Sequence, residues 1–213
     1  MEPSVAVLGF EGRRVPRTLH DLPLLSGNDE TVLDAAIADY GRLIVIGGDA
    51  DLATVLRRLL RTGRLDIEVG YVPARRSPAS RIHRIPTGQR AARRARLGSP
   101  QRVALIRDET GSVVVGRARW LPPSSSPTVH GEAVADDTQL FDGDVAGIVI
   151  EPTPELPGAR ARVLGQLARR WVSARAIQLG SDGVMVERDG VVASRPARRS
   201  TFYRNTEGWL LVR

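Results

Sequence analysis

The segment from Leu43 to Asp51 constrains the fold of this chain more than any other. It begins with four apolar residues, Leu43–Ile46, which are typical of a strand buried on both faces of a parallel sheet. Gly47 and Gly48 then allow a tight turn, and residues 52–60 repeat apolar side chains at helical spacing. A strand, a glycine turn and a helix N-terminus together form a place where backbone N–H groups hold a phosphate.

Two carboxylates in this turn leave two interpretations open. Asp49 and Asp51 repel a bare phosphate unless a metal ion lies between them, so a nucleotide or phosphate pocket built on Gly47, Gly48, Asp49 and Asp51 needs a cation. Alternatively, the turn is purely structural and Asp51 is the N-cap of the following helix, which is worth roughly 1 kcal/mol. The first interpretation accounts for Gly47–Asp49 and the second accounts for Asp51.

The surrounding pattern predicts an α/β fold. Strands are expected at 5–9, 43–46 and 67–72, with helices at 29–40 and 52–63 between them, which is the order of a parallel sheet with right-handed crossovers. A loop at 74–85 and a helix at 89–97 follow. We therefore expect a Rossmann-like parallel-sheet domain over residues 1–98, and a β-rich, sandwich-like domain over 99–213.

Within the second domain the pattern predicts short strands and turns. The expected elements are a hairpin around 108–111, a strand at 147–150, a helix at 163–172, strands at 176–179 and 184–186, a turn at Asp189-Gly190, and strands at 200–203 and 209–212.

Charge is distributed unevenly along the chain. The formal net charge is +7 and every basic residue is arginine; residues 69–107 hold ten arginines and no acid, whereas residues 131–155 hold seven acids and no arginine. Clustered arginines favour phosphate or carboxylate partners. The arginines of this run are therefore predicted to bind an anionic ligand, with Arg75 and Arg76 as the cofactor-binding pair; the residues are Arg75, Arg76, Arg81, Arg84, Arg90, Arg93, Arg94 and Arg96. Candidate ligands are nucleotide phosphates and an anionic membrane surface at roughly 1 kcal/mol per arginine. Nucleic acid ranks last, because no aromatic residue interleaves the basic run. The alternative is an ordinary solvated surface.

Other residue types set further limits. The chain has no cysteine, no apolar run of membrane-spanning length and no signal-peptide pattern, which leads us to expect a cytoplasmic protein, with peripheral membrane contact if the arginines bind lipid. The acidic segment offers Asp142 and Asp144 as ligands for a hard cation such as magnesium. The same residues also fit an ordinary turn before a strand.

With these elements in place, the chain resembles the diacylglycerol kinase and sphingosine kinase family of lipid kinases, which share a fold with NAD kinases. Gly47–Asp51 stands where that family has its Gly-Gly-Asp-Gly-Thr nucleotide signature, and Ile67–Pro73 is similar to the next strand. Residues 81–98 resemble the segment that follows the family's Gly-Thr-x-Asn-Asp motif. Asp189-Gly190 resembles its Asp-Gly-Glu. The resemblance implies ATP and Mg²⁺ as cofactors and a lipid hydroxyl as phosphoryl acceptor.

The chain also departs from that family at the positions that carry its chemistry. Ala50 and Asp51 replace the glycine and threonine of the nucleotide signature, and residues 74–78 lack the family's amide and carboxylate. Val191 stands in place of the glutamate that acts as general base, and Gly9–Arg14 replaces the opening phosphate loop.

Three hypotheses follow. The first is a degenerate relative that binds a nucleotide or anionic ligand without ordinary kinase activity. The second is an active ATP-dependent lipid kinase with a rearranged site, in which Asp49 lies near the metal and phosphate. The third is a scaffold protein whose acidic and basic segments pair between the subunits of a homodimer.

Overall fold

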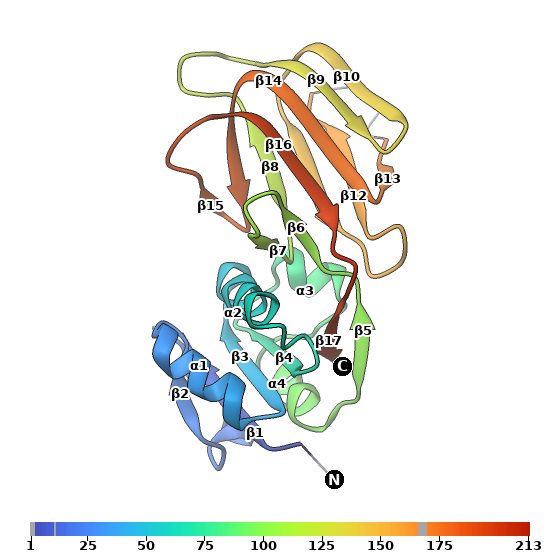
Figure 1. The fold of residues 1–213 in the computed structure, drawn as a ribbon. Helices are drawn as coiled ribbons and strands as arrows, with labels where there is room; N and C mark the ends of the chain where they lie inside the picture. Colours follow the sequence, from blue (N-terminus) through green and yellow to red (C-terminus); the bar gives the residue numbers. More distant parts are fainter. Residues whose placement is uncertain (1–2, 11, 166–169) are drawn as a thin grey trace. The chain divides into compact units, whose positions relative to one another are not determined.

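A computed structural model describes residues 3–213 except 11 and 166–169, and the chain divides into two units (Figure 1). The N-terminal unit comprises Met1–Val103 together with Glu207–Arg213, and the C-terminal unit comprises Ala104–Thr206. This division differs from the one expected at residue 98. The strand that follows residue 98 belongs to the N-terminal unit, and the last residues of the chain return to the same sheet.

A six-stranded sheet forms the centre of the N-terminal unit and has the predicted parallel, Rossmann-like character. Its first five strands in spatial order are parallel, and the sixth is antiparallel to its neighbour. In that order the strands are β2 (Leu24–Ser26), β1 (Val5–Gly9), β3 (Arg42–Gly47), β4 (Glu68–Pro73), β17 (Trp209–Val212) and β5 (Pro100–Val103). Strand β3 lies between β1 and β4 and is buried at every position, as its apolar run predicts.

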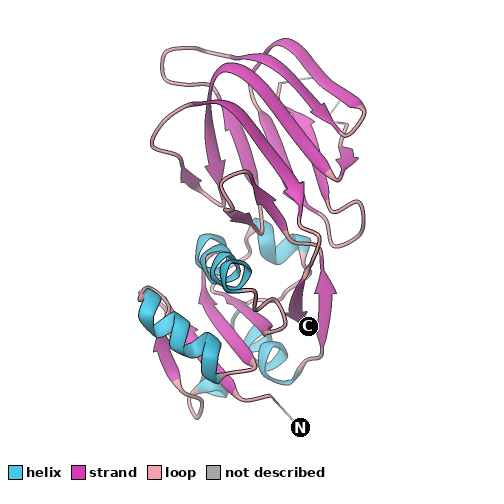
Figure 2. Ribbon diagram, viewed as in Figure 1, coloured by secondary structure: helices cyan, strands magenta, loops and turns pink. Residues whose placement is uncertain are grey.

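The described helices all belong to the N-terminal unit (Figure 2). They are η1 (Arg17–Leu19), α1 (Glu30–Asp39), α2 (Asp49–Thr62), α3 (Pro78–Ile82) and α4 (Gly88–Leu97). Asp29 caps α1, because its carboxylate accepts from the N–H groups of Thr31 and Val32 at 2.8 and 3.2 Å. Helix α2 ends at Gly63, whose φ of 68° few other residues adopt without strain.

Two features of the region around β4 and α4 matter for the site. The segment predicted as a loop at 74–85 contains the short helix α3, since Ser77 is an N-cap and Pro78 is suited to the first helical position. Helix α4 approaches β4 closely at Gly70, where a Cβ would lie 2.6 Å from the Cβ of Ala95. The absence of a side chain at Gly70 therefore sets the position of α4.

The C-terminal unit is β-rich, as predicted. Eight strands follow one another in space in the order β13 (Val172–Ala174), β12 (Ala159–Val163), β11 (Ile148–Pro152), β8 (Ala118–Leu121), β14 (Ala176–Arg188), β16 (Ala197–Arg204), β6 (Ile106–Asp108) and β7 (Val113–Val114). Three more strands pair outside this order: β9 (Val129–Ala135) and β15 (Val191–Val192) with β14, and β10 (Thr138–Val145) with β9. Trp120 and Phe202 are fully buried in its core, and the indole N–H of Trp120 donates to Ser200 Oγ at 3.0 Å.

Several local predictions for this unit are confirmed and others are wrong. The hairpin between β6 and β7 and the turn at Asp189-Gly190 are present. The two strands expected at 176–179 and 184–186 form one strand, β14, with an irregularity between Gly180 and Val184. The middle of the helix expected at 163–172 falls on residues 166–169, outside the described residues, and its two ends lie in β12 and β13. None of the described helices is long and apolar enough to cross a bilayer.

Candidate functional site

The Gly-Gly-Asp turn lies at the carboxyl end of β3, beside a reversal in the order of the sheet. The chain runs from β1 outward to β2, then crosses to β3 on the other side of β1. In open α/β sheets, ligands bind outside the carboxyl ends of the strands at such a reversal. Two hollows of about 690 and 230 Å³ open in this region. The larger is lined in part by Gly9, Arg13 and Arg14, and the smaller in part by Asp51, Arg57 and Arg61.

Asp51 closes the start of α2 with its own carboxylate. The Gly48 N–H donates to Asp51 Oδ2 at 2.7 Å, and Gly48, not Asp51, is the N-cap. The expectation that Asp51 is the N-cap is therefore wrong. Asp51 is the third residue of the helix, and its carboxylate accepts from the N–H of the N-cap residue, Gly48. A Cβ on Gly47 would lie 2.6 Å from Asp51 Oδ2, so this carboxylate also covers the glycine turn.

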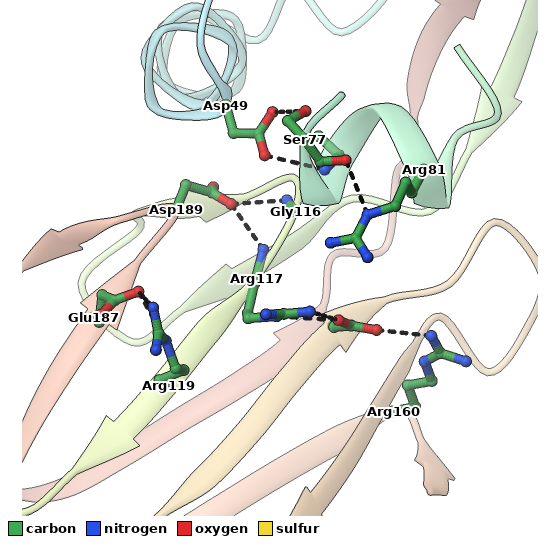
Figure 3. Close-up of polar contacts among 11 residues, drawn as sticks. Asp49, Ser77, Arg81, Gly116, Arg117, Arg119, Arg160, Glu187 and Asp189 are labelled. Atoms are coloured by element: carbon green, nitrogen blue, oxygen red, sulfur yellow. Dashed lines mark hydrogen bonds and ion pairs between the residues drawn. The ribbon is translucent and has the colours of Figure 1, made fainter. Parts of the chain in front are cut away.

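Asp49 is buried, and both of its oxygens accept hydrogen bonds. Oδ1 accepts from the Tyr71 hydroxyl at 2.9 Å. It also accepts from the Ser77 hydroxyl at 2.6 Å, while Oδ2 accepts from the Ala79 N–H at 3.0 Å (Figure 3). Burial, together with the negative charge of Asp49, raises the pKa of Tyr71 above its usual range, so this hydroxyl keeps its proton.

These bonds decide whether the turn suits a nucleotide with its magnesium ion. The Gly48 N–H is taken by Asp51, and the Asp49 oxygens are taken by three donors. The turn thus offers no free N–H at Gly48, and the Asp49 carboxylate is buried with three of its roughly four acceptor positions in use. Family-type ATP and Mg²⁺ do not fit these residues as they stand. The binding role predicted for Gly47, Gly48, Asp49 and Asp51 stays a prediction, in competition with these internal bonds.

A third hollow, of about 430 Å³, lies over α3 and the start of α4, and we call it the arginine hollow. It is lined by five arginines together with small polar and apolar residues: Arg76, Arg81, Arg84, Arg90, Arg94, Ser80, Ile85, Pro86 and Thr87. Among the described residues, none of those that line it is acidic. Its volume falls within the range of small-ligand sites.

Three of the five guanidinium groups that line this hollow form no hydrogen bond or ion pair with another described residue. Within the described part of the chain, the guanidinium groups of Arg76, Arg84 and Arg90 have no hydrogen-bond or ion-pair partner. Arg94 donates to the Arg84 carbonyl at 3.2 Å, and Arg81 makes a long contact of 3.4 Å with the Ser77 carbonyl. Arg84 itself has a φ of 54°, a backbone conformation that costs a non-glycine residue energy.

The rest of the basic run divides into two kinds of arginine. Arg96 is structural: it forms two bonds of 2.7 Å with the carboxylate of Asp21, and the hydrogen bond from Arg96 lowers the pKa of Asp21. Arg75 and Arg93 are exposed and do not line the hollow. Of the two arginines predicted to bind a cofactor, Arg76 therefore lines the hollow and Arg75 lies outside its lining.

The C-terminal unit holds a second engaged carboxylate, at the turn between β14 and β15. Asp189 has a φ of 49° and accepts from three successive N–H groups, those of Val115, Gly116 and Arg117, at 3.0, 2.8 and 2.8 Å. Figure 3 shows the bonds from Gly116 and Arg117. Successive N–H groups that converge in this way form an anion-binding nest. The turn at Asp189-Gly190 is predictable from the sequence, but the nest is not, because its donors lie more than seventy residues earlier in the chain.

Ion pairs cross one face of the sheet in the same unit. Glu151 is buried and accepts from Arg117 and Arg160, both at 2.7 Å, and Glu187 pairs with Arg119 (Figure 3). Burial raises the pKa of Glu151, but the hydrogen bonds from Arg160 and Arg117 outweigh this effect and the net shift is downward. Glu151 is therefore held ionised.

The predicted magnesium ligands lie on β10. Asp144 accepts from the Thr128 hydroxyl at 2.9 Å and faces His130 at 3.4 Å, and Asp142 is paired across the strands with Glu132. Among the described residues, no three acidic, histidine or cysteine side chains are grouped in a way that could hold a metal ion. The magnesium site stays a prediction.

Comparison with solved structures places the whole chain in one fold. A diacylglycerol kinase from Bacillus anthracis str. Sterne is similar over 98% of this chain and 96% of its own length, with a TM-score of 0.73 and 12% identity. An NAD kinase from Archaeoglobus fulgidus, determined in complex with ATP, is similar over 98% of this chain and 93% of its own, with a TM-score of 0.65 and 10% identity. The chain thus has the fold shared by diacylglycerol kinases and NAD kinases, as the sequence resemblance implies.

The amino-acid sequence shows no similarity that would extend this result from the fold to an activity. No protein-family model matches the chain, and no curated protein matches it. At identities of 10 to 12%, the similarity concerns the fold and not the activity.

Proposed function

We propose that this chain is a phosphoanion-binding protein of the diacylglycerol kinase fold that does not transfer phosphoryl groups. The observation that carries the proposal is the arginine hollow of about 430 Å³, whose described lining contains five arginines and no acidic residue. Arginine binds phosphate through planar, bidentate hydrogen bonds, and several guanidinium groups in one hollow favour a doubly charged group over a carboxylate.

The absence of phosphoryl transfer is supported by the engaged carboxylates. Transfer needs groups that position a metal ion and deprotonate the acceptor. Asp49 is buried under three donors, and the residue that follows Asp189-Gly190 is Val191, which has no proton-accepting group. We therefore propose that the ligand is held and not converted, and that binding needs no magnesium.

The ligand belongs to one chemical class, a terminal phosphate group, which either a nucleotide or an anionic lipid headgroup supplies. The test uses the full chain with three probes: ATP, inorganic phosphate, and phosphatidylcholine vesicles that contain phosphatidic acid. Thermal shift and titration calorimetry with and without magnesium measure binding, because a ligand that binds only the folded protein raises its melting temperature. A parallel assay follows ADP release and lipid phosphorylation.

A matched pair of variants identifies the site. Arg90 lines the arginine hollow and Arg93 does not, yet both are exposed on α4 and each substitution removes one positive charge. We expect Arg90→Ala to weaken phosphate binding about tenfold, the loss of one charge-assisted contact, and Arg93→Ala to change it less than twofold. Equal effects would reduce the hollow to a diffuse positive surface. ATP-dependent phosphorylation of a lipid would refute the proposal and favour an active kinase.

A further inference from the structure

We infer that Asp49 is a positioning residue for the arginine hollow: its carboxylate fixes the N-terminus of α3, and with it the arginines that α3 and its flanks contribute. This inference rests on the proposed function and deepens it. It gives the Gly-Gly-Asp turn a task other than holding a nucleotide, namely that of arranging a neighbouring anion site.

The contacts of Asp49 join three elements. Asp49 is the first residue of α2 and only 9% exposed. Its carboxylate accepts from the Ser77 hydroxyl at 2.6 Å and the Ala79 N–H at 3.0 Å, both at the start of α3, and from the Tyr71 hydroxyl at 2.9 Å on β4. The Ser77 hydroxyl in turn accepts from the Ser80 N–H at 3.1 Å. One carboxylate therefore secures the cap and the first turn of α3.

The residues that flank this tether line the hollow. Arg76 directly precedes Ser77, Ser80 directly follows Ala79, and Arg81 comes next. Helix α3 has only five residues, too few to be stable without help from its surroundings. Asp49 supplies that help, so Arg76 and Arg81 are held near their binding positions before a ligand arrives. Cations held in advance cost less to order upon binding.

Electrostatics and the loss of the tether change the affinity of Asp49→Ala for anions in opposite directions. Removal of the Asp49 carboxylate raises the net charge of the protein by one, and by electrostatics alone this strengthens anion binding. The tether predicts the opposite, because α3 loses its fixed start. We expect Asp49→Ala to weaken binding about tenfold, as is reasonable when two arginines must be ordered by the ligand itself.

Asp51→Ala is the matched control. It removes a carboxylate from the same helix and changes the charge equally. Among the described residues, however, the Asp51 carboxylate accepts only from the Gly48 N–H, within the turn. We expect Asp51→Ala to bind anions as well as the wild type or better. Tyr71→Phe is a second control, since it removes one bond to Asp49 and leaves both bonds to α3 in place. It should leave affinity within twofold of the wild type.

The experiment is a titration of each full-length variant with magnesium-free ATP, inorganic phosphate and the phosphatidic acid vesicles, at a temperature where the variant is folded. Weaker binding by Asp49→Ala together with unchanged or tighter binding by Asp51→Ala supports the inference. Binding by Asp49→Ala that equals or exceeds that of the wild type overturns it, even if its melting temperature falls. Should Asp49→Ala not fold, Ser77→Ala tests the same contact without a change of charge, and unaltered affinity in that variant overturns the inference.

Hydrogen exchange separates this inference from the proposed function. A wild-type chain that binds none of the probes refutes the proposed function. Whether or not the wild type binds a probe, Asp49→Ala or Ser77→Ala should accelerate hydrogen exchange of the amides in residues 77–82. The acceleration should be at least tenfold relative to Asp51→Ala, because α3 opens locally when its bonds to Asp49 are lost. Unchanged exchange there would show that Asp49 does not hold α3.

Discussion

Substitution of Gly70 by alanine tests how the sheet positions α4. The added Cβ would lie 2.6 Å from the Cβ and 3.0 Å from the Cα of Ala95, and neither atom can swing aside as the tip of a long side chain can. Overpacking of this kind costs about 1–3 kcal/mol, whereas a strand alanine regains roughly 0.5–1 kcal/mol relative to glycine. We expect a net loss of about 1–2 kcal/mol in the free energy of unfolding.

For a chain of this length, such a loss lowers the melting temperature by about 2–8 °C. Scanning calorimetry is the appropriate assay, because it records the unfolding of both units and therefore also reports on a control in the C-terminal unit. Gly180→Ala is the control: this glycine is also in a strand, and an added Cβ there has no neighbour within 4 Å. If Gly70→Ala were no less stable than Gly180→Ala, the close packing of α4 on β4 would be refuted as the reason for a glycine at position 70.

Two further predictions concern backbone strain and pH. Arg84→Gly should raise the free energy of unfolding by about 1 kcal/mol, because glycine tolerates the φ of 54° just after α3, and denaturant titration measures this gain. The same variant should bind phosphate more weakly, because Arg84 lines the arginine hollow, and calorimetry measures this loss. The pKa of Glu151 lies below its ordinary value of 4.5, so its ion pairs stabilise the C-terminal unit fully above pH 4.5 and lose that contribution as pH falls through the lowered pKa. The stability difference between wild type and Glu151→Gln should therefore be largest near neutral pH and shrink toward pH 3, and a constant difference would contradict it.

The sequence predicted the framework of the N-terminal unit because local signals and tertiary packing agree there. The apolar run at 43–46 and the stripe at Leu52, Leu56 and Leu59 match the buried faces of β3 and α2. Asp29 and Gly63 mark helix ends by side-chain and backbone chemistry that acts over a few residues. The return of the C-terminal strand to this sheet was missed, because its pairing with β4 joins residues about 140 positions apart and leaves no local signal.

The residue types in the sequence suggest candidate site residues, but they do not reveal the hydrogen-bond partners of those residues. Sequence analysis identified Asp49 and Asp51 as the notable carboxylates of the turn, but not which donors they face. Asp49 takes its donors from β4 and α3, and the short helix α3 was itself missed because Ser77-Pro78 reads equally well as a turn. The acid-free arginine run predicted a cationic surface, yet only folding separates Arg96, paired with Asp21, from the arginines of the hollow.

The internal bonds also decide which donors remain for an external anion. Asp51 occupies the Gly48 N–H, and Asp189 occupies the nest formed by Val115, Gly116 and Arg117. Backbone N–H groups are fixed in direction, so they select a ligand by its shape. Guanidinium groups on flexible side chains select a ligand mainly by its charge, and salt weakens their attraction to it. The chain fills these backbone sites with its own carboxylates, and no described carboxylate pairs with the guanidinium groups of the arginine hollow. We therefore propose that this chain recognises phosphate by charge, at an arginine cluster that Asp49 helps to order in advance.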